Sequence, residues 1–287
     1  MVYFISIQTF QLFSYYKMPY PIDLIYVWCG KPETKYCKFN LDLTYSVKSV
    51  RKFMPWIRHI WVVVDDQFPM SESKSMPRNI KLVRESEFIP KKYLPITWNS
   101  NVPESWIWRI PGLSEHFIYS CDDMYVGKPI NPSDFFVGER PITRLCPGPP
   151  DYPAKTNSPI PYVQMWSNAV DKYNLNYTRI QHQILPYRKS HMEQFYKKYK
   201  KQVDAASNNK IRAGALDFNL LRFTSALAPM SGQGFVLVTN EPYDYFTECD
   251  DLKRVKKILK VRPTFFCINN NSIENKHVTK MLDKYFA

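Results

Sequence analysis

Two adjacent carboxylates, Asp122 and Asp123, follow a short apolar run in the stretch HFIYSCDDMYVGKPINPSDFF at residues 116–136. Carboxylate oxygens at the end of a strand can hold Mg²⁺ or Mn²⁺, because these hard cations take oxygen ligands and often share them with substrate phosphates. Adjacent aspartates also occur in solvated turns and as helix N-caps, which need no ligand. The residue types therefore allow a metal site or a plain turn, and the position of the pair in the fold is needed to choose between them.

The segments around this pair alternate between strand-like and helix-like patterns. Short apolar runs rich in β-branched and aromatic residues predict strands at 22–28, 57–64, 79–83, 116–121 and 262–271. Apolar spacings of three and four predict a helix over 43–54 that ends before Pro55, and a second helix over 102–110 with Asn99 or Ser100 as its cap. This alternation predicts an α/β fold with a mostly parallel, Rossmann-like sheet flanked by helices.

The same alternation predicts where a ligand would bind. In open α/β sheets, ligands lie at the carboxyl ends of the strands, in the crevice where the strand order reverses. Asp122 and Asp123 follow the carboxyl end of their predicted strand, and Asp65 and Asp66 follow another strand in the same way. Both pairs are therefore expected at the ligand-binding edge of the sheet, although Asp-Asp after a strand also serves as a simple turn.

The chain shows no internal repeat and no clear domain boundary. We predict an N-terminal extension at 1–20 and a single domain at 21–287, with a Pro- and Gly-rich insertion around 138–157 that reads as a long irregular loop or lid. The apolar residues 1–13 lack a basic start and are too short to span a bilayer, so membrane contact through the N-terminus is the less favoured interpretation.

Composition indicates a globular protein with an anionic partner. The 287 residues are 45% hydrophobic, and 39 Lys and Arg against 26 Asp and Glu give a net charge of +13. Residues 188–212 hold eight Lys or Arg against one Glu and one Asp, which fits either a solvated helix face or a phosphate-binding surface. The six cysteines form no CxxC pair, which argues against a zinc site and favours a reducing, cytoplasmic location.

Longer blocks of the sequence resemble a known family. The blocks are IDLIYVW, LTYSVKSVRKFMPWIRHIWVVVDDQFP, LPITWNSNVPESWIWRIPGLSEHFIYSCDDMYVGKPINPSDFF and FFCINN. They are similar to the successive conserved regions of the Stealth proteins, the capsular polysaccharide phosphotransferases that include the catalytic subunit of the lysosomal GlcNAc-1-phosphotransferase. The resemblance is dense over 22–136, patchy over 177–217, and present again at 262–270.

The resemblance implies a nucleotide-sugar-binding, GT-A-like α/β fold and a defined reaction. Family members transfer a sugar-1-phosphate from a UDP-sugar, such as UDP-GlcNAc, to a hydroxyl of a glycan acceptor and release UMP. Asp122 and Asp123 match the Asp-Asp of the family's NDD motif, so they are expected to hold Mg²⁺ or Mn²⁺ on the diphosphate. The implied partners are a nucleotide-sugar donor and a glycan acceptor, and no nucleic acid is expected.

Three further residues are expected to take part in catalysis. His182 matches a family His and is the candidate general base, although a surface polar role is the plain alternative. Arg109 matches a family Arg that could pair with phosphate, or it could only face the helix dipole. Asp217 could orient the base, or form a helix ion pair with Arg212.

Substrate binding is assigned to a set of aromatic and cationic residues, which are Trp28, Lys48, Arg109, Arg188 and Arg212. Arginine suits a phosphate because its planar fork can donate two parallel hydrogen bonds.

The chain also departs from the family pattern. Ionisable or hydrogen-bonding family residues are replaced at six positions, namely Cys29, Phe39, Trp106, Trp108, Cys121 and Asn270. Trp106 and Trp108 lie two residues apart and would diverge by about 200° on a helix, so we expect them not to share a face. Packing of both in the core is the favoured interpretation, and stacking of one of them on a sugar or base is the alternative. The replacements leave two other functions open. One is a glycosyltransferase that releases UDP, and the other is a non-catalytic basic protein that binds a glycan or nucleic acid.

Overall fold

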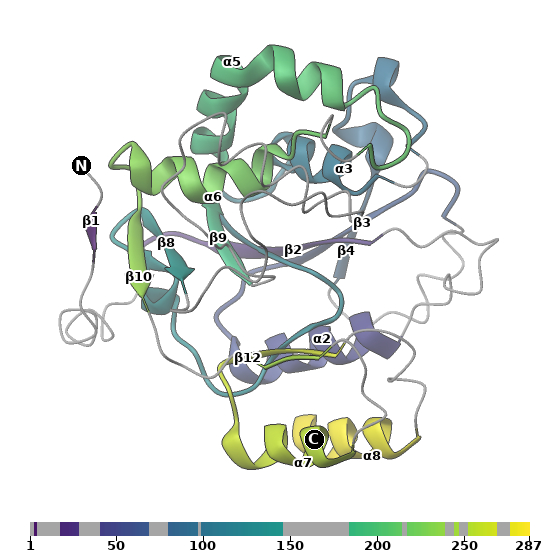
Figure 1. Ribbon diagram of the computed structural model, residues 1–287, viewed down its shortest axis with the longest axis vertical. Coiled ribbons are helices and arrows are strands. Elements are labelled where there is room, and N and C mark those ends of the chain that lie inside the picture. Colours follow the sequence, from purple (N-terminus) through teal and green to yellow (C-terminus); the bar gives the residue numbers. More distant parts are fainter. Residues whose placement is uncertain are drawn as a thin grey trace.

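The structure, a computed structural model, consists of layers stacked on a central sheet (Figure 1). It describes residues 3–4, 18–28, 41–68, 80–96, 99–145, 184–213, 217–238, 244–246, 252–268 and 276–287. His182, part of the 138–157 segment and part of the N-terminal extension lie outside these ranges. The predicted domain limits stay predictions.

The central sheet has five strands in the spatial order β4-β3-β2-β5-β9. The strands are β4 (Ile80–Arg84), β3 (Ile60–Val64), β2 (Ile22–Val27), β5 (His116–Ser120) and β9 (Leu185–Arg188). The first four are parallel and β9 is antiparallel to β5, which confirms the predicted α/β, mostly parallel fold. The chain leaves β2 toward β3 and β4 and later returns to place β5 on the other side of β2. The strand order therefore reverses between β2 and β5, and the ligand edge is expected at their carboxyl ends.

One face of the sheet is covered by α2 (Leu41–Phe53), which confirms the helix predicted from the apolar spacing. Its buried residues Leu43, Val47 and Val50 pack in one cluster with Leu24 and Ile118 of the sheet. Next to α2 lies a second, three-stranded sheet of β6 (Met124–Val126), β11 (Asp244–Phe246) and β12 (Phe265–Ile268). Helices α7 (Leu252–Val261) and α8 (Lys276–Phe286) lie below α2 and β12 in Figure 1. Strand β12 confirms the last predicted strand.

The opposite face of the sheet is covered by three helices, α3 (Asn101–Trp106), α5 (Lys189–Ala206) and α6 (Leu220–Met230), which lie above the sheet in Figure 1. Val102 and Trp106 of α3 and Phe195 of α5 join one apolar cluster with Val27 and Tyr119 of the sheet. Helices therefore flank both faces of the sheet, as the doubly wound fold requires.

A further sheet has the order β1-β10-β8-β7. Its strands are β1 (Tyr3–Phe4), β10 (Phe235–Val238), β8 (Arg140–Leu145) and β7 (Phe136–Val137), and four short 3₁₀ turns lie at Glu85–Glu87, Lys91–Tyr93, Ile107–Arg109 and Pro132–Asp134. Strand β8 corrects the prediction of an irregular segment over 138–157. The β-branched Ile142 and Thr143 pair in register with β10, and Pro141 lies opposite Phe136, so the proline does not prevent a strand here.

The expectation that Trp106 and Trp108 do not share a face is also wrong. Helix α3 ends at Trp106, and the chain continues as a 3₁₀ turn over Ile107–Arg109. The break brings the two indoles together, with ring centroids 6.4 Å apart and planes 22° apart. Tyr196 of α5 packs against both rings, so the pair belongs to the contact between α3 and α5.

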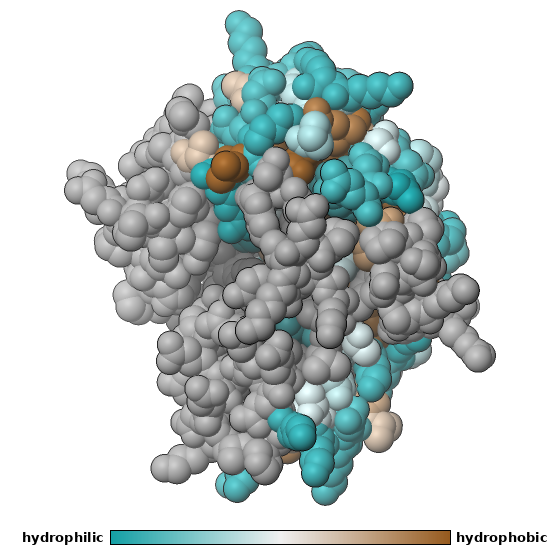
Figure 2. All heavy atoms as spheres, turned by 90° about the vertical axis from the view of Figure 1, so that its right-hand side faces the viewer, coloured by the Kyte–Doolittle hydropathy of each residue, from teal (hydrophilic) through white to brown (hydrophobic). Residues whose placement is uncertain are grey.

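Most of the basic segment 188–212 forms α5. Lys197, Lys198, Lys200 and Lys201 are exposed on this helix, and two of them pair with acids one turn away, which fits a solvated face. In a view turned by 90°, Figure 2 shows mainly hydrophilic described atoms at the top of the molecule, where α5 lies, and at the base, where α7 and α8 lie. None of the helices in the described ranges is long and apolar enough to cross a membrane.

A buried carboxylate anchors the amino ends of the central strands. Asp23 on β2 is fully buried and accepts two hydrogen bonds from Arg58, from Nε at 2.8 Å and from Nη2 at 2.7 Å. Trp61 Nε1 and the Ser114 backbone N–H donate to the same carboxylate at 3.0 and 2.9 Å. Burial alone would raise the pKa of Asp23, but these bonds lower it below its ordinary value.

Two buried histidines lie at the same amino end. His116 begins β5 and stacks on Tyr20 at 3.7 Å, and His191 lies in the first turn of α5. One ring nitrogen of each, Nε2 of His116 and Nδ1 of His191, is buried and has no hydrogen-bond partner among the described residues. Burial and the nearby Arg188 lower the pKa of both, for His191 to about 4.

We therefore expect the protein to lose stability in mild acid. Because the pKa of His191 is lower in the folded than in the unfolded state, the unfolded chain binds more protons as pH falls from 6.5 toward 4. The loss should reach on the order of 3 kcal/mol at pH 4. Urea unfolding at pH 7, 6, 5 and 4 measures it, and the His191→Phe variant should show a shallower slope. An equal slope in wild type and variant would contradict this assignment.

Candidate functional site

Asp122 and Asp123 lie in a tight turn at the carboxyl end of β5. The turn is closed by the Met124 backbone N–H, which donates to the Cys121 carbonyl at 3.2 Å, and both aspartates are half-buried. Strand β5 pairs with β2 up to the contact of Ser120 with Tyr26, so the turn begins where the paired strands end. The pair therefore lies next to the point where the strand order reverses, as the sequence predicts.

Strand β12 holds Asp123 from the neighbouring layer. The Ile268 backbone N–H donates to the Asp123 carbonyl at 3.1 Å, and the Cys267 thiol donates to the Asp123 carboxylate at 3.3 Å. Cys267 is fully buried, and burial together with the nearby Asp123 raises the pKa of its thiol, so the sulfur stays protonated and remains a donor. Asp123 is thereby fixed through both its backbone and its side chain.

The residues of this turn suit a divalent cation that also binds a substrate. Within the described ranges, no group of three or more His, Cys, Asp or Glu side chains is arranged to hold a metal by itself. Mg²⁺ is commonly bound by one or two carboxylates and completes its shell with substrate phosphates and water. The two half-buried carboxylates of Asp122 and Asp123 could therefore hold a cation that completes its shell with substrate oxygens and water.

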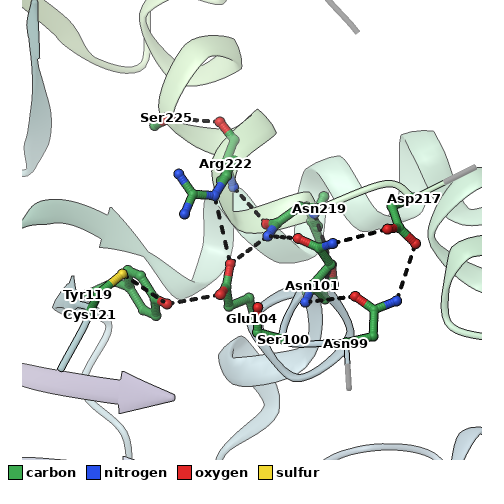
Figure 3. Close-up of polar contacts among 12 residues, drawn as sticks. Asn99, Ser100, Asn101, Glu104, Tyr119, Cys121, Asp217, Asn219, Arg222 and Ser225 are labelled. Carbon is green, nitrogen blue, oxygen red and sulfur yellow. Dashed lines mark hydrogen bonds and ion pairs between the residues drawn. The ribbon is translucent and has the colours of Figure 1, made fainter. Parts of the chain in front are cut away.

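A buried polar network lies on the α3 and α6 side of the same edge (Figure 3). Glu104 of α3 is at its centre. Its carboxylate accepts hydrogen bonds from the Tyr119 hydroxyl at 2.9 Å and from the Asn219 amide, and it lies 3.9 Å from Arg222 Nε. Tyr119 is the fourth residue of β5, and its hydroxyl lies 3.7 Å from the sulfur of Cys121, the residue before Asp122. The network thus extends from α6 to the Asp-Asp turn.

Asp217 forms the other end of this network. Its carboxylate accepts from the amides of Asn99 at 3.2 Å and Asn101 at 3.3 Å, and from the Ala213 backbone N–H at 2.8 Å. It is buried, whereas Arg212 is exposed and donates to the Ser100 hydroxyl at 2.7 Å. The two residues lie outside any helix and do not pair, so the helix ion pair considered from the sequence is wrong. Asp217 instead fastens the chain before α6 to the start of α3.

The other predicted site residues are spread over the molecule. Arg109 is exposed at the end of the 3₁₀ turn, with its guanidinium 5.6 Å from the centre of the Trp106 ring. Trp28 follows β2 at the ligand edge but is buried, with its ring packed edge-on to Phe68 at 5.6 Å. Lys48 is exposed in α2 and pairs with Asp283 of α8 at 3.3 Å.

Arg188 lies at the opposite end of the sheet. It is aligned with His116 at the amino end of β5 and pairs with Glu115 at 2.9 Å and Glu139 at 3.3 Å. The structure therefore does not bring Arg188 to the Asp-Asp turn. His182 lies outside the described residues, and its role stays a prediction.

The second Asp-Asp pair, after β3, is used within the fold. The Asp65 carboxylate accepts from the Gln67 backbone N–H at 2.7 Å, and Asp66 accepts from the Ser86 hydroxyl and backbone N–H. These are turn contacts between neighbouring segments.

Sequence reasoning did not single out Glu104 or Arg222. Their side chains are 118 residues apart in the chain and meet only after α3 and α6 pack on the same face of the sheet. A weak signal was available, because Glu104 interrupts an otherwise apolar and small-residue helix, and Arg222 is the single charge in α6. Burial works to lower the pKa of Arg222, but Glu104 and the neighbouring Cys121 raise it overall, so the guanidinium is charged.

The mostly parallel sheet, with acidic residues where its strand order reverses, places the protein among the open-sheet α/β proteins. Proteins of this class bind ligands at the carboxyl ends of the strands. Comparisons with known proteins make the assignment specific. Residues 37–143 match the family model described as Stealth protein CR2, conserved region 2.

Whole proteins match over most of the chain. A capsular polysaccharide phosphotransferase, fcs1, of Haemophilus influenzae is 33% identical over 92% of this chain and 82% of its own length. Capsular polysaccharide phosphotransferases of Neisseria meningitidis serogroup B and Actinobacillus suis are 31% and 30% identical, over 95% and 86% of this chain and 78% and 71% of their own lengths. The chain belongs to the Stealth family of capsular polysaccharide phosphotransferases, as the resemblance of its blocks predicts. It is an enzyme that transfers phosphate-containing groups.

Proposed function

We propose that this enzyme transfers a sugar-1-phosphate from a UDP-sugar, of the UDP-GlcNAc type, to a hydroxyl of a glycan acceptor and releases UMP in polysaccharide synthesis. The observation that carries the proposal is the position of Asp122 and Asp123 at the strand-order reversal, in a chain similar along most of its length to capsular polysaccharide phosphotransferases. The location supports a substrate with a diphosphate, because this edge of α/β sheets commonly binds nucleotides.

In this reaction the acceptor oxygen forms a bond to the β-phosphorus of the donor. The bond between that phosphorus and the oxygen bridging to the uridylate breaks, and its electron pair leaves with UMP. The acceptor proton passes to a base, for which His182 is the candidate. Asp122 and Asp123 would hold Mg²⁺ or Mn²⁺, which when bound supplies positive charge beside the phosphoryl oxygens. The Cys267 thiol holds the carboxylate of Asp123 and the Ile268 N–H holds its backbone carbonyl, so that Asp123 need not reorganise as charge develops.

The test is the identity of the released nucleotide. Purified protein is incubated with a panel of UDP-sugars, Mg²⁺ or Mn²⁺ and simple glycan acceptors, and the nucleotides are separated by chromatography. UMP that appears only with acceptor and metal is the expected result. UDP would instead identify a glycosyltransferase that attacks the anomeric carbon, and the absence of both nucleotides under every pairing would contradict the proposal.

A further inference from the structure

Arg222 is paired through only one edge of its guanidinium within the described residues. Glu104 lies 3.9 Å from Nε, and in the described part of the chain no acceptor is bound to either terminal nitrogen of Arg222. Figure 3 shows these two nitrogens pointing away from Glu104 and from the Asn219–Asp217 end of the network. Arginine's five donors form a fixed fork, and the two terminal nitrogens suit the oxygens of a phosphate.

The position of Arg222 makes that fork available to a ligand. Its side chain is 28% exposed, whereas that of Glu104 is 5% exposed, so the acid is buried and the cation reaches solvent. Glu104 is itself held by Tyr119 and by Asn219, so it orients the guanidinium from a fixed position. A buried carboxylate that holds one edge of a partly exposed arginine leaves the other edge preorganised for an anion.

Helix α6 adds to the attraction for an anion. It has 11 residues, begins after the N-cap Asn219, and carries Arg222 in its first turn, where the helix dipole is positive. Arg222 lies 3.9 Å from Glu104, Glu104 accepts a hydrogen bond from Tyr119 at 2.9 Å, and the Tyr119 hydroxyl lies 3.7 Å from the sulfur of Cys121, which adjoins Asp122. Arg222 is thus joined through three consecutive contacts to the turn that would hold the cation.

We propose that Arg222, held by Glu104, binds a phosphate oxyanion of a substrate at the carboxyl edge of the sheet. This inference rests on the proposed function for the identity of the substrate. The phosphate can belong to the donor, as the α-phosphate of the diphosphate, which leaves in UMP, or it can be a phosphate group already present on the acceptor glycan. Both sources present the same chemistry to the guanidinium, and binding measurements separate them.

The experiment compares wild-type protein with Arg222→Gln and Arg222→Lys by titration calorimetry with UMP and inorganic phosphate. KM values for the UDP-sugar and for acceptors with and without a terminal phosphate are measured in parallel. Losing charge-assisted hydrogen bonds should weaken phosphate binding by about 10- to 100-fold in Arg222→Gln. Arg222→Lys should recover part of the affinity, because it keeps the charge and loses the fork. The matched control is Arg51→Gln, an exposed arginine of α2 on the other face of the sheet, which should bind as wild type does.

The outcomes assign the phosphate to its source. Weaker binding of UMP and a raised donor KM indicate the donor, whereas unchanged UMP binding with a raised KM only for the phosphorylated acceptor indicates the acceptor. Wild-type affinities and KM values in both variants overturn the inference, as does failure of the wild-type protein to bind any of these phosphates. Circular dichroism checks folding, and if Arg222→Gln is unfolded, Arg222→Lys decides, with about 10-fold weaker binding expected.

Failure of this inference and failure of the proposed function give different results. Arginine-dependent binding of UMP without turnover would support the phosphate site and remove the proposed reaction. UMP release at the wild-type rate and KM in both variants would support the reaction and remove Arg222 from the site.

Discussion

Replacing Asp123 by Asn is expected to lower the rate of sugar-phosphate transfer by about 100- to 1,000-fold or more while leaving the fold intact. The amide is the same size as the carboxylate, and its oxygen can still accept the hydrogen bond that Cys267 donates. The Ile268 bond to the Asp123 carbonyl is also unaffected, because it involves only the backbone. The substitution removes the negative charge with which Asp123 would hold the proposed divalent cation.

The matched control for this prediction is Asp65→Asn. Asp65 also follows a parallel strand of the sheet, but its carboxylate closes a local turn with the Gln67 backbone. Its substitution should leave turnover within about threefold of the wild type, since it makes a local contact only. Steady-state rates over a range of Mn²⁺ concentrations check both variants. If Asp123→Asn turns over at the rate of the wild type with the same metal dependence, Asp123 has no part in the mechanism.

Replacing Arg58 by Met is expected to destabilise the folded protein by about 3 kcal/mol, at the lower end of the range for breaking a buried ion pair. Asp23 is fully buried, and without Arg58 its carboxylate would keep the hydrogen bonds from Trp61 and the Ser114 backbone, with His59 Nδ1 3.6 Å away. Asp23 joins β2 to β3 and to the segment before β5 through these bonds. An unpaired charge on Asp23 should therefore weaken the central sheet itself.

The free energy of unfolding measured in urea at pH 7 tests this prediction. Lys81→Met serves as the control, because Lys81 is an exposed neighbour whose ammonium lies over the Trp61 ring at 4.9 Å. An exposed cation–π contact is worth about 0.5–1 kcal/mol, so the control should change stability little. Equal stabilities of Arg58→Met and wild type would show that the buried carboxylate does not depend on its partner.

Most of the central sheet was predictable from local pattern. The continuous apolar runs of β2, β3 and β5 mark strands buried on both faces, and the spacing of Leu43, Val47 and Val50 marks the buried face of α2. Strands β8 and β9 were not predicted, since each contains a proline and each is stabilised by pairing with strands distant in the chain. The stacking of Trp106 on Trp108 was missed because a helix was assumed to continue where a 3₁₀ turn begins.

The site was predictable only where local sequence pattern determines the position of a residue. Asp122 and Asp123 follow a recognisable strand, so their place at the ligand edge follows from the parallel topology. The pairing of Glu104 with Arg222 depends on how two helices pack, which no local pattern encodes. Arg188 illustrates the reverse case, because its sequence neighbourhood is rich in cations while its strand places it at the amino end of β5.

In the proposed reaction phosphorus, and not only a sugar, moves to the acceptor. The most direct test uses a UDP-sugar that supports turnover and carries ³²P at the β-phosphorus, with the label followed by chromatography of glycan and nucleotide. We expect the label to appear in the glycan, in equal amount to the UMP released, and Asp123→Asn to prevent this transfer. Label that stays in UDP while the glycan gains unlabelled sugar would rule out phosphate transfer and identify a glycosyltransferase.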